Sequence, residues 1–74
     1  MAETQLNLRG LKCPLPALKT RKALRGVPSG DVLVVTCTDP LAVIDIPALV
    51  NETGHVLEDQ AEEDGALVFR IRKG

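Results

Sequence analysis

Val32-Leu33-Val34-Val35-Thr36-Cys37 is a short run of apolar and β-branched residues that is hydrophobic on both of its faces. A run of this kind is typical of a strand inside a sheet, whereas a strand at a wet surface alternates apolar and polar residues. The preceding Pro28-Ser29-Gly30-Asp31 predicts a turn. We therefore expect residues 32–37 to form a central strand.

The residues before this strand predict a first strand followed by a helix. Thr4 to Leu8 alternates apolar and polar side chains, as in a half-buried strand, and Gly10 ends it. Pro14 to about Arg25 is rich in good helix formers, and Gly26 follows where helices commonly end. The apolar stripe of this helix contains Ala17, Leu18 and Leu24.

The residues after the central strand predict a second helix that is interrupted. Asp39 is a typical N-cap, and Pro40 is a typical first helical residue. Pro47 removes a backbone hydrogen bond inside the helix, so we expect a kink or a restart there, with Asp45 as a second cap. The stripe expected to face the core contains Ala42, Val43, Ile46, Leu49 and Val50.

The last third of the chain predicts a hairpin. Gly54 ends the second helix, and a weaker strand runs from His55 to about Glu62. Asp64-Gly65 is typical of a type I′ turn, because both central residues of that turn need a positive φ. A final strand follows, with an alternating apolar set of Leu67, Phe69 and Ile71.

The predicted order of elements is βαβαββ. The first two strands, joined through a helix, should be parallel with a right-handed crossover, and the last two should be antiparallel. The fold class is therefore α+β, a two-layer α/β sandwich with a mixed four-stranded sheet and two helices on one face. A chain of 74 residues makes a single domain, residues 1–74, with a thin core.

Composition and charge narrow the classes of function. Phe69 is the only aromatic residue and the net charge is -1, so we expect no direct nucleic-acid binding. No apolar stretch approaches the roughly 20 residues that span a membrane, and Met1-Ala2-Glu3-Thr4-Gln5 lacks the features of a signal peptide. Two cysteines in such a chain fit a reducing compartment. We expect a cytoplasmic protein with no membrane partner.

The charges are unevenly distributed along the chain. Basic residues predominate in residues 1–30, where Glu3 is the only acid, whereas residues 52–64 contain acidic residues and no Lys or Arg. Two interpretations stay open: solvated faces of a helix and a hairpin, or a basic surface that docks an acidic partner protein.

Cys13 has the most informative surroundings of any residue in the chain. It lies between two basic residues, Arg9 and Lys12, and two prolines, Pro14 and Pro16. A cysteine just before a helix-starting proline would sit at a helix N-terminus, where free N–H groups and the helix dipole favour the thiolate. The basic neighbours act in the same direction. We therefore expect the pKa of Cys13 to be lowered.

Chain topology predicts the neighbours of Cys13. Two parallel strands end at the same edge of a sheet, so Cys13 should lie at one rim with Cys37, Thr38, Asp39 and the nearby Asp45. We expect Cys37 to be a core or rim filler. If its sulfur lies near that of Cys13, an oxidative disulfide can form.

Several chemistries have no residue pattern to support them. The chain has no C-x-x-C pair and no Gly-rich phosphate loop. Its two cysteines and single histidine lie in distant segments, so we expect no metal and no cofactor. His55, at the start of the third strand, is expected to be an exposed loop residue rather than a base for Cys13. What is left is one reactive thiol without a base or a pocket, which suits a carrier of a chemical group better than a stand-alone enzyme.

The motifs of the chain resemble those of the TusA (SirA-like) sulfur carrier proteins, from Leu6 to Gly74. The resemblance rests on a Cys-Pro-x-Pro signature with a preceding Arg-Gly and on two later motifs. These segments are Leu8-Arg9-Gly10-Leu11-Lys12-Cys13-Pro14-Leu15-Pro16, Thr38-Asp39-Pro40 with Asp45-Ile46-Pro47, and Ile71-Arg72-Lys73-Gly74.

The resemblance implies the βαβαββ fold and a function in sulfur relay. Cys13 would accept a sulfane sulfur as a persulfide from a cysteine desulfurase or a rhodanese-like donor and pass it to an acceptor protein. Acceptors in such families serve tRNA thiolation, molybdenum cofactor assembly or sulfur oxidation, and some relatives are linked to selenium metabolism or thiosulfate uptake. The supporting residues would be Arg9, Lys12, Pro14, Pro16, Asp39 and Asp45.

An alternative is a regulatory or interaction module in which Cys13 senses oxidants. A sensor should form a sulfenate or a Cys13–Cys37 disulfide with peroxide. A carrier should instead gain the mass of one sulfur atom from a persulfide donor.

Overall fold

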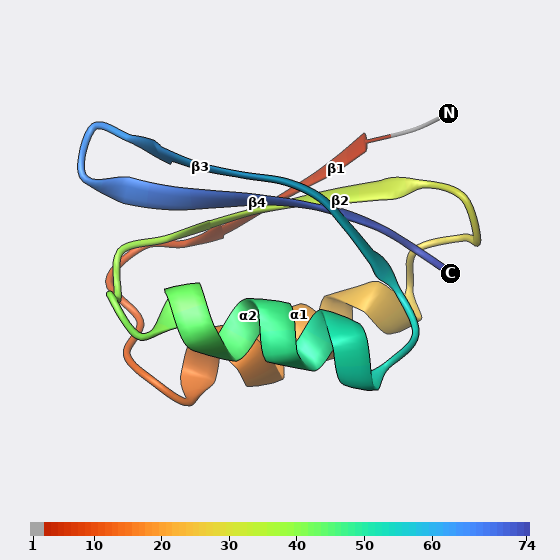
Figure 1. Ribbon diagram of the computed structural model, residues 1–74, viewed down its shortest axis with the longest axis horizontal. Coiled ribbons are helices and arrows are strands. Elements are labelled where there is room, and N and C mark those ends of the chain that lie inside the picture. The colour runs from red at the N-terminus through yellow and green to blue at the C-terminus, as the bar shows by residue number, and fades with distance from the viewer. Residues whose placement is uncertain (1–2) are drawn as a thin grey trace.

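Four strands and two helices follow one another in the predicted order βαβαββ (Figure 1). The computed structural model describes residues 3–74; Met1 and Ala2, which begin the segment expected to lack a signal, lie outside the described residues. The elements are β1 (Glu3–Leu8), α1 (Leu15–Arg25), β2 (Val32–Cys37), α2 (Ala42–Glu52), β3 (Val56–Glu63) and β4 (Ala66–Arg72). Over residues 3–74, no helix has both the length and the apolar character needed to cross a membrane.

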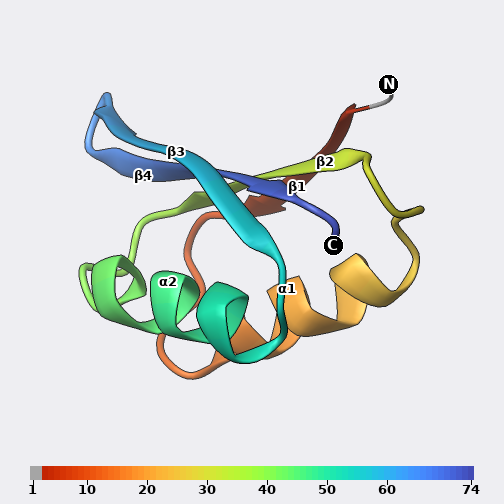
Figure 2. The same ribbon diagram turned by 45° about the vertical axis from the view of Figure 1, so that its right-hand side comes forward.

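The strands form one mixed sheet in the order β1-β2-β4-β3. β1 and β2 are parallel, with Leu8 opposite Cys37, so both strands end at the same edge. The pairs β2–β4 and β3–β4 are antiparallel. Both helices lie on one face of the sheet, as the two views show (Figures 1 and 2). The predicted two-layer α+β fold and the central place of β2 are therefore confirmed.

The core lies between the helix layer and the sheet. Its largest fully buried side chain is Phe69 of β4, and Leu33, Val35 and Cys37 of β2 are also completely buried. The alternate residues of β2, Val34 and Thr36, are only half-buried. The second face of β2 is therefore less covered than its apolar sequence suggests, because the helices cover one side of the sheet only.

α1 begins one residue later than its sequence pattern suggests. Leu15 is its first residue, Pro14 occupies the N-cap, and the Cys13–Pro14 peptide bond is cis. The buried side chains of α1 are Pro16, Thr20 and Leu24, four residues apart, and the hydroxyl of Thr20 has no hydrogen-bond partner. The predicted stripe is wrong at Leu18, which is 56% exposed. The stripe is displaced because polar Thr20, rather than an apolar residue, occupies the central inward position.

α2 continues through Pro47 without a restart. The predicted second cap at Asp45 is therefore wrong, because residues on both sides of the proline are held against the sheet by buried Ile46, Leu49 and Val50. Val43, expected in the core stripe, is 44% exposed. The helix itself starts at Ala42, after a turn that contains Asp39 and Pro40.

The β3–β4 hairpin has the predicted turn. Asp64 has a φ of 50° and Gly65 a φ of 79°, so both central residues are left-handed, as a type I′ turn requires. β3 is an edge strand, and all its residues but Leu57 are exposed. In the sheet, β4 pairs directly with β2, whereas β3 is separated from β2 by β4.

Candidate functional site

Cys13 lies in the loop between β1 and α1, at the edge where β1 and β2 both end. Two hydrogen bonds join this loop to the loop after β2. The backbone N–H of Gly10 donates to Thr38 Oγ1 over 2.9 Å, and the backbone N–H of Cys13 donates to Asp39 Oδ2. The predicted rim is therefore confirmed: parallel pairing places residues from two distant segments side by side.

Asp39 connects this loop to the start of α2. Its Oδ2 accepts from the Cys13 N–H, and its Oδ1 accepts from the Leu41 N–H over 3.0 Å. These two hydrogen bonds, the one from Leu41 first, lower the pKa of Asp39, and the positive charge of Lys12 acts in the same direction. The prediction that Asp39 is the N-cap of α2 and Pro40 its first residue is wrong. The helix begins at Ala42 with Leu41 at the N-cap, because Asp39 uses its carboxylate on the turn before the helix.

The thiol of Cys13 is bonded to a second carboxylate. Cys13 Sγ donates a hydrogen bond to Asp45 Oδ2 over 2.8 Å. Asp45 belongs to the first turn of α2, and it lines the groove between the two helices together with Cys13. Asp45 thus has a place at the site, but as the partner of the thiol and not as a helix cap.

The expectation of a lowered pKa for Cys13 is wrong. The hydrogen bond to Asp45 is the main cause that raises the pKa of Cys13, and partial desolvation and the negative charges of Asp45 and Asp39 add to it. The basic neighbours do not offset this effect: Lys12 acts on Asp39, and the Arg9 guanidinium donates to Asn7 Oδ1 over 3.4 Å. The thiol therefore holds its proton more tightly than an ordinary cysteine.

The two prolines of the signature hold different places. Pro16 is buried within the first turn of α1, where it anchors the helix start against the core. Pro14 is exposed and lies beside the sulfur. Together they place Cys13 immediately outside the helix, with its side chain exposed.

The thiol lies between two open surface grooves, which contradicts the expectation of a sulfur without a pocket. One groove has a volume of about 400 Å³ and is lined by residues that include Leu11, Lys12, Thr38, Pro40 and Leu41. The other, of about 320 Å³, runs between the two helices, and its lining includes Ala17, Leu18, Arg21, Asp45 and Leu49. Cys13 lines both grooves, so a partner could approach it from either side.

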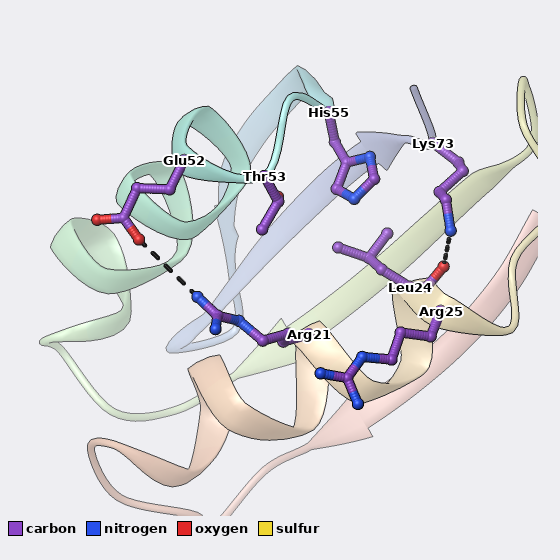
Figure 3. A pocket seen from close by; sticks show the side chains of 7 residues that line it. All are labelled: Arg21, Leu24, Arg25, Glu52, Thr53, His55 and Lys73. Atoms are coloured by element: carbon purple, nitrogen blue, oxygen red, sulfur yellow. Dashed lines mark hydrogen bonds and ion pairs between the residues drawn. The ribbon is translucent and has the colours of Figure 1, made fainter.

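A third cavity, of about 420 Å³, lies at the C-terminal ends of α1 and α2 (Figure 3). Arg21 and Glu52 form an ion pair over 3.8 Å at its border, and Lys73 Nζ donates to the carbonyl of Leu24. His55 lines this cavity, where its Nδ1 accepts from the Gly74 N–H over 3.0 Å. Burial, followed by the charge of Lys73, lowers the pKa of His55. His55 is half-buried, not exposed as expected, and it shares no cavity with Cys13.

Cys37 is part of the core, as predicted. Its side chain is completely buried beside the apolar residues of β2, and both cysteines are free thiols. Burial, followed by the charge of Asp39, raises the pKa of Cys37 to about 11. Within residues 3–74, no group of three or more His, Cys, Asp or Glu side chains is arranged to hold a metal ion.

The hydrogen bond between Cys13 and Asp45 is the feature of the site that sequence reasoning missed. The pattern contained one usable signal, because Asp45 precedes the buried Ile46 near the start of a helix that follows the same sheet edge. Helix phase alone did not reveal it, because the expected break at Pro47 assigned Asp45 to capping.

Comparison with known proteins identifies the family of the chain. The family described as "Sulfurtransferase TusA" matches residues 4–73. A protein of Neisseria meningitidis serogroup A, named as a candidate sulfur carrier, is 44% identical over 72 residues, which cover 97% of each chain. The sulfur carrier protein TusA of Allochromatium vinosum is 42% identical over 71 residues, 96% of this chain and 93% of its own. The chain therefore belongs to the TusA sulfurtransferase family.

Proposed function

We propose that this protein is a sulfur carrier and that Cys13 holds a sulfane sulfur as a persulfide. The observation that supports the proposal best is the placement of Cys13: its thiol is exposed, its backbone and side chain are bonded to two carboxylates, and grooves open on both sides. Such a thiol can be reached by the cysteine of another protein. Within residues 3–74, the two grooves beside it are open to solvent, which suits the approach of a protein surface.

The donor and the acceptor would both be proteins. The donor would be a cysteine desulfurase or a rhodanese-like protein, and the acceptor would serve sulfur relay in tRNA thiolation, cofactor assembly or sulfur oxidation in the cytoplasm. Large apolar side chains are exposed on the elements around the thiol, which suits docking of another protein surface. They are Leu15, Leu18, Leu41, Val43 and Ile44.

The residues around Cys13 would support transfer in different ways. Pro14 and Pro16 limit the freedom of the loop, which reduces the entropy lost when a partner docks. Asp39 would hold the backbone of Cys13 in place through its N–H. Arg9 and Lys12 are exposed cations that could attract an acidic partner surface, an effect that salt weakens.

The oxidant-sensor alternative receives less support from the geometry. Cysteines that sense oxidants have a low pKa, since the thiolate is the species that reacts. The carboxylate contact raises the pKa of Cys13 instead. A sulfur carrier also reacts through the thiolate, so it would need a group that takes up the thiol proton during transfer.

Intact-mass spectrometry tests the proposed function. After incubation with a cysteine desulfurase and cysteine, the protein should gain the mass of one sulfur atom, and reduction should remove it. Cys13→Ser should gain nothing, whereas Cys37→Ser should still be loaded, because Cys37 is buried. Loading of Cys13→Ser to the wild-type level would refute the role of Cys13.

A further inference from the structure

The thiol of Cys13 has a carboxylate partner whose position is set by the fold. Cys13 Sγ and Asp45 Oδ2 are 2.8 Å apart, and Asp45 lies in the first turn of an eleven-residue helix. The next residue, Ile46, is completely buried and ties that turn to the core. The carboxylate is therefore held against the sulfur by the packing of α2 and not by a flexible surface loop.

The other charged groups around the thiol have different partners. Asp39 uses both carboxylate oxygens on backbone N–H groups. Arg21 and Glu52, which line the groove between the helices, pair with each other over 3.8 Å. Lys12 lines the opposite groove, and its positive charge lowers the pKa of Asp39. Among residues 3–74, Asp45 is the one side chain that forms a hydrogen bond with Cys13 Sγ.

We propose that Asp45 accepts the proton of Cys13 and returns it during sulfur transfer. The inference rests on the proposed sulfur-carrier function and adds a proton route to it. A thiol that keeps its proton attacks slowly and also leaves slowly, because both steps depend on the thiolate. A carboxylate in hydrogen-bond contact with the thiol can accept the proton when the sulfur attacks and donate it when the sulfur leaves.

Loading of the carrier is balanced as follows. Cys13 Sγ attacks the outer sulfur of a donor persulfide, R–S–S⁻, while its proton moves to Asp45. The new Sγ–S bond forms as the donor S–S bond breaks, and the electron pair of that bond leaves with the donor cysteine sulfur, which takes the proton from Asp45. The products are Cys13–S–S⁻ and R–SH. The transferred sulfur keeps its oxidation state, so no oxidant or reductant is needed.

Discharge is the reverse process with an acceptor thiol, A–SH. The acceptor gives its proton to Asp45 and attacks the outer sulfur, which forms A–S–S⁻. The electron pair of the broken Sγ–S bond leaves with Cys13 Sγ, which takes the proton back from Asp45. Thiols of high pKa are slow leaving groups, so the return of the proton should matter most at this step.

Two rates measured on Asp45→Asn test the proposal. The first is alkylation of Cys13 by iodoacetamide as a function of pH, and the second is transfer of sulfur from the loaded protein to dithiothreitol, followed by intact mass. Removal of the carboxylate charge should shift the alkylation profile to lower pH, yet discharge should slow by about 100-fold or more because the proton route is lost. Glu63→Gln, which removes a similar charge from exposed β3, should change neither rate.

The two rates should therefore move in opposite directions. If Asp45→Asn speeds alkylation and leaves discharge equal or faster, Asp45 acts through its charge alone and the proposal is wrong. Slowing of both rates together indicates structural damage and also overturns it. If Asp45→Asn does not fold, Asp45→Glu should still discharge faster than Asp45→Ser, and equal rates would contradict the role. Failure of the wild-type protein to take up sulfur at all would instead refute the proposed function.

Discussion

Asp39 is a single side chain that joins two segments far apart in the sequence. Its carboxylate accepts the N–H of Cys13 from one loop and the N–H of Leu41 from another. Both bonds favour the ionised form, which is why the pKa of Asp39 lies below the ordinary aspartate value of 3.8. The positions of the Cys13 loop and of the turn before α2 therefore depend on the negative charge of Asp39.

The stability that Asp39 contributes should depend on pH. A group whose pKa is lowered by folding stabilises the native state above its unfolded-state pKa, and this contribution is lost as pH falls through the folded-state pKa. Asp39→Ala should therefore melt several degrees below wild type at neutral pH, and the difference should shrink as pH falls below the ordinary value of 3.8. Thermal unfolding followed by circular dichroism measures this. A difference that does not change with pH would contradict the assignment.

The chemistry of Cys13 was inferred incorrectly from its neighbours in the chain. Arg9 and Lys12 are close in sequence, but the carboxylates of Asp39 and Asp45 are the charges that raise the thiol pKa. The basic residues near Cys13 can be identified from the sequence. The hydrogen bonds from Cys13 to Asp39 and Asp45 form only in the folded chain. For a single residue, the electrostatic environment belongs to the folded chain.

Turns and helix ends were the elements that local sequence specified best. The Asp64-Gly65 turn has the positive φ values that its residue types predict, and Gly54, with a φ of 77°, follows the end of α2 as expected. These features could be predicted because they depend on the steric limits of one or two residues. The passage of α2 through Pro47 could not, because burial of side chains on both sides of the proline outweighs the lost hydrogen bond.

Alanine substitutions at Gly65 and Gly26 should have different effects on the free energy of unfolding. Gly65→Ala puts a Cβ on a residue with a φ of 79°, and no neighbouring atom lies within 4 Å of that Cβ, so the cost comes from the backbone alone. We expect the free energy of unfolding to fall by about 1–2 kcal/mol.

Gly26→Ala is the matched control for Gly65→Ala. Gly26 has a φ of -91°, and an added Cβ would meet the Ala23 carbonyl oxygen at an ordinary 3.6 Å. The free energy of unfolding should stay the same or rise by up to about 1 kcal/mol, since the alanine lowers the entropy of the unfolded chain. Urea-induced unfolding measures both variants, and equal destabilisation of the two would contradict the explanation.

The whole molecule depends on a small core with one aromatic side chain. Phe69 is completely buried on β4, between the helices and the sheet. Phe69→Ala should lower the free energy of unfolding by about 3–5 kcal/mol, through lost burial and a cavity. Small domains are stable by only about 5–15 kcal/mol, so this variant should be close to unfolding at room temperature.

Val56→Ala is the comparison for the Phe69→Ala variant. Val56 begins the edge strand β3 and is 50% exposed, so its removal should cost less than about 1 kcal/mol. Urea unfolding midpoints report both values when the slope with denaturant is unchanged. Similar losses in the two variants would show that Phe69 is not the centre of the core.

The sequence by itself determined the order of elements, the parallel β1–β2 pair, the antiparallel β3–β4 pair and the hairpin turn. These depend on apolar periodicity, on turn residues with restricted φ and on short motifs, all of which are local properties of the chain. Only the tertiary structure decided which face of β2 is covered, that α2 continues through Pro47, and that the Cys13 N–H and Sγ form hydrogen bonds with Asp39 and Asp45. The reason is that Asp39 and Asp45 lie 26 and 32 positions after Cys13 in the sequence, so their distances from its thiol are set by the packing of α2 against α1 and the sheet. The electrostatic energy of the thiolate depends on those distances.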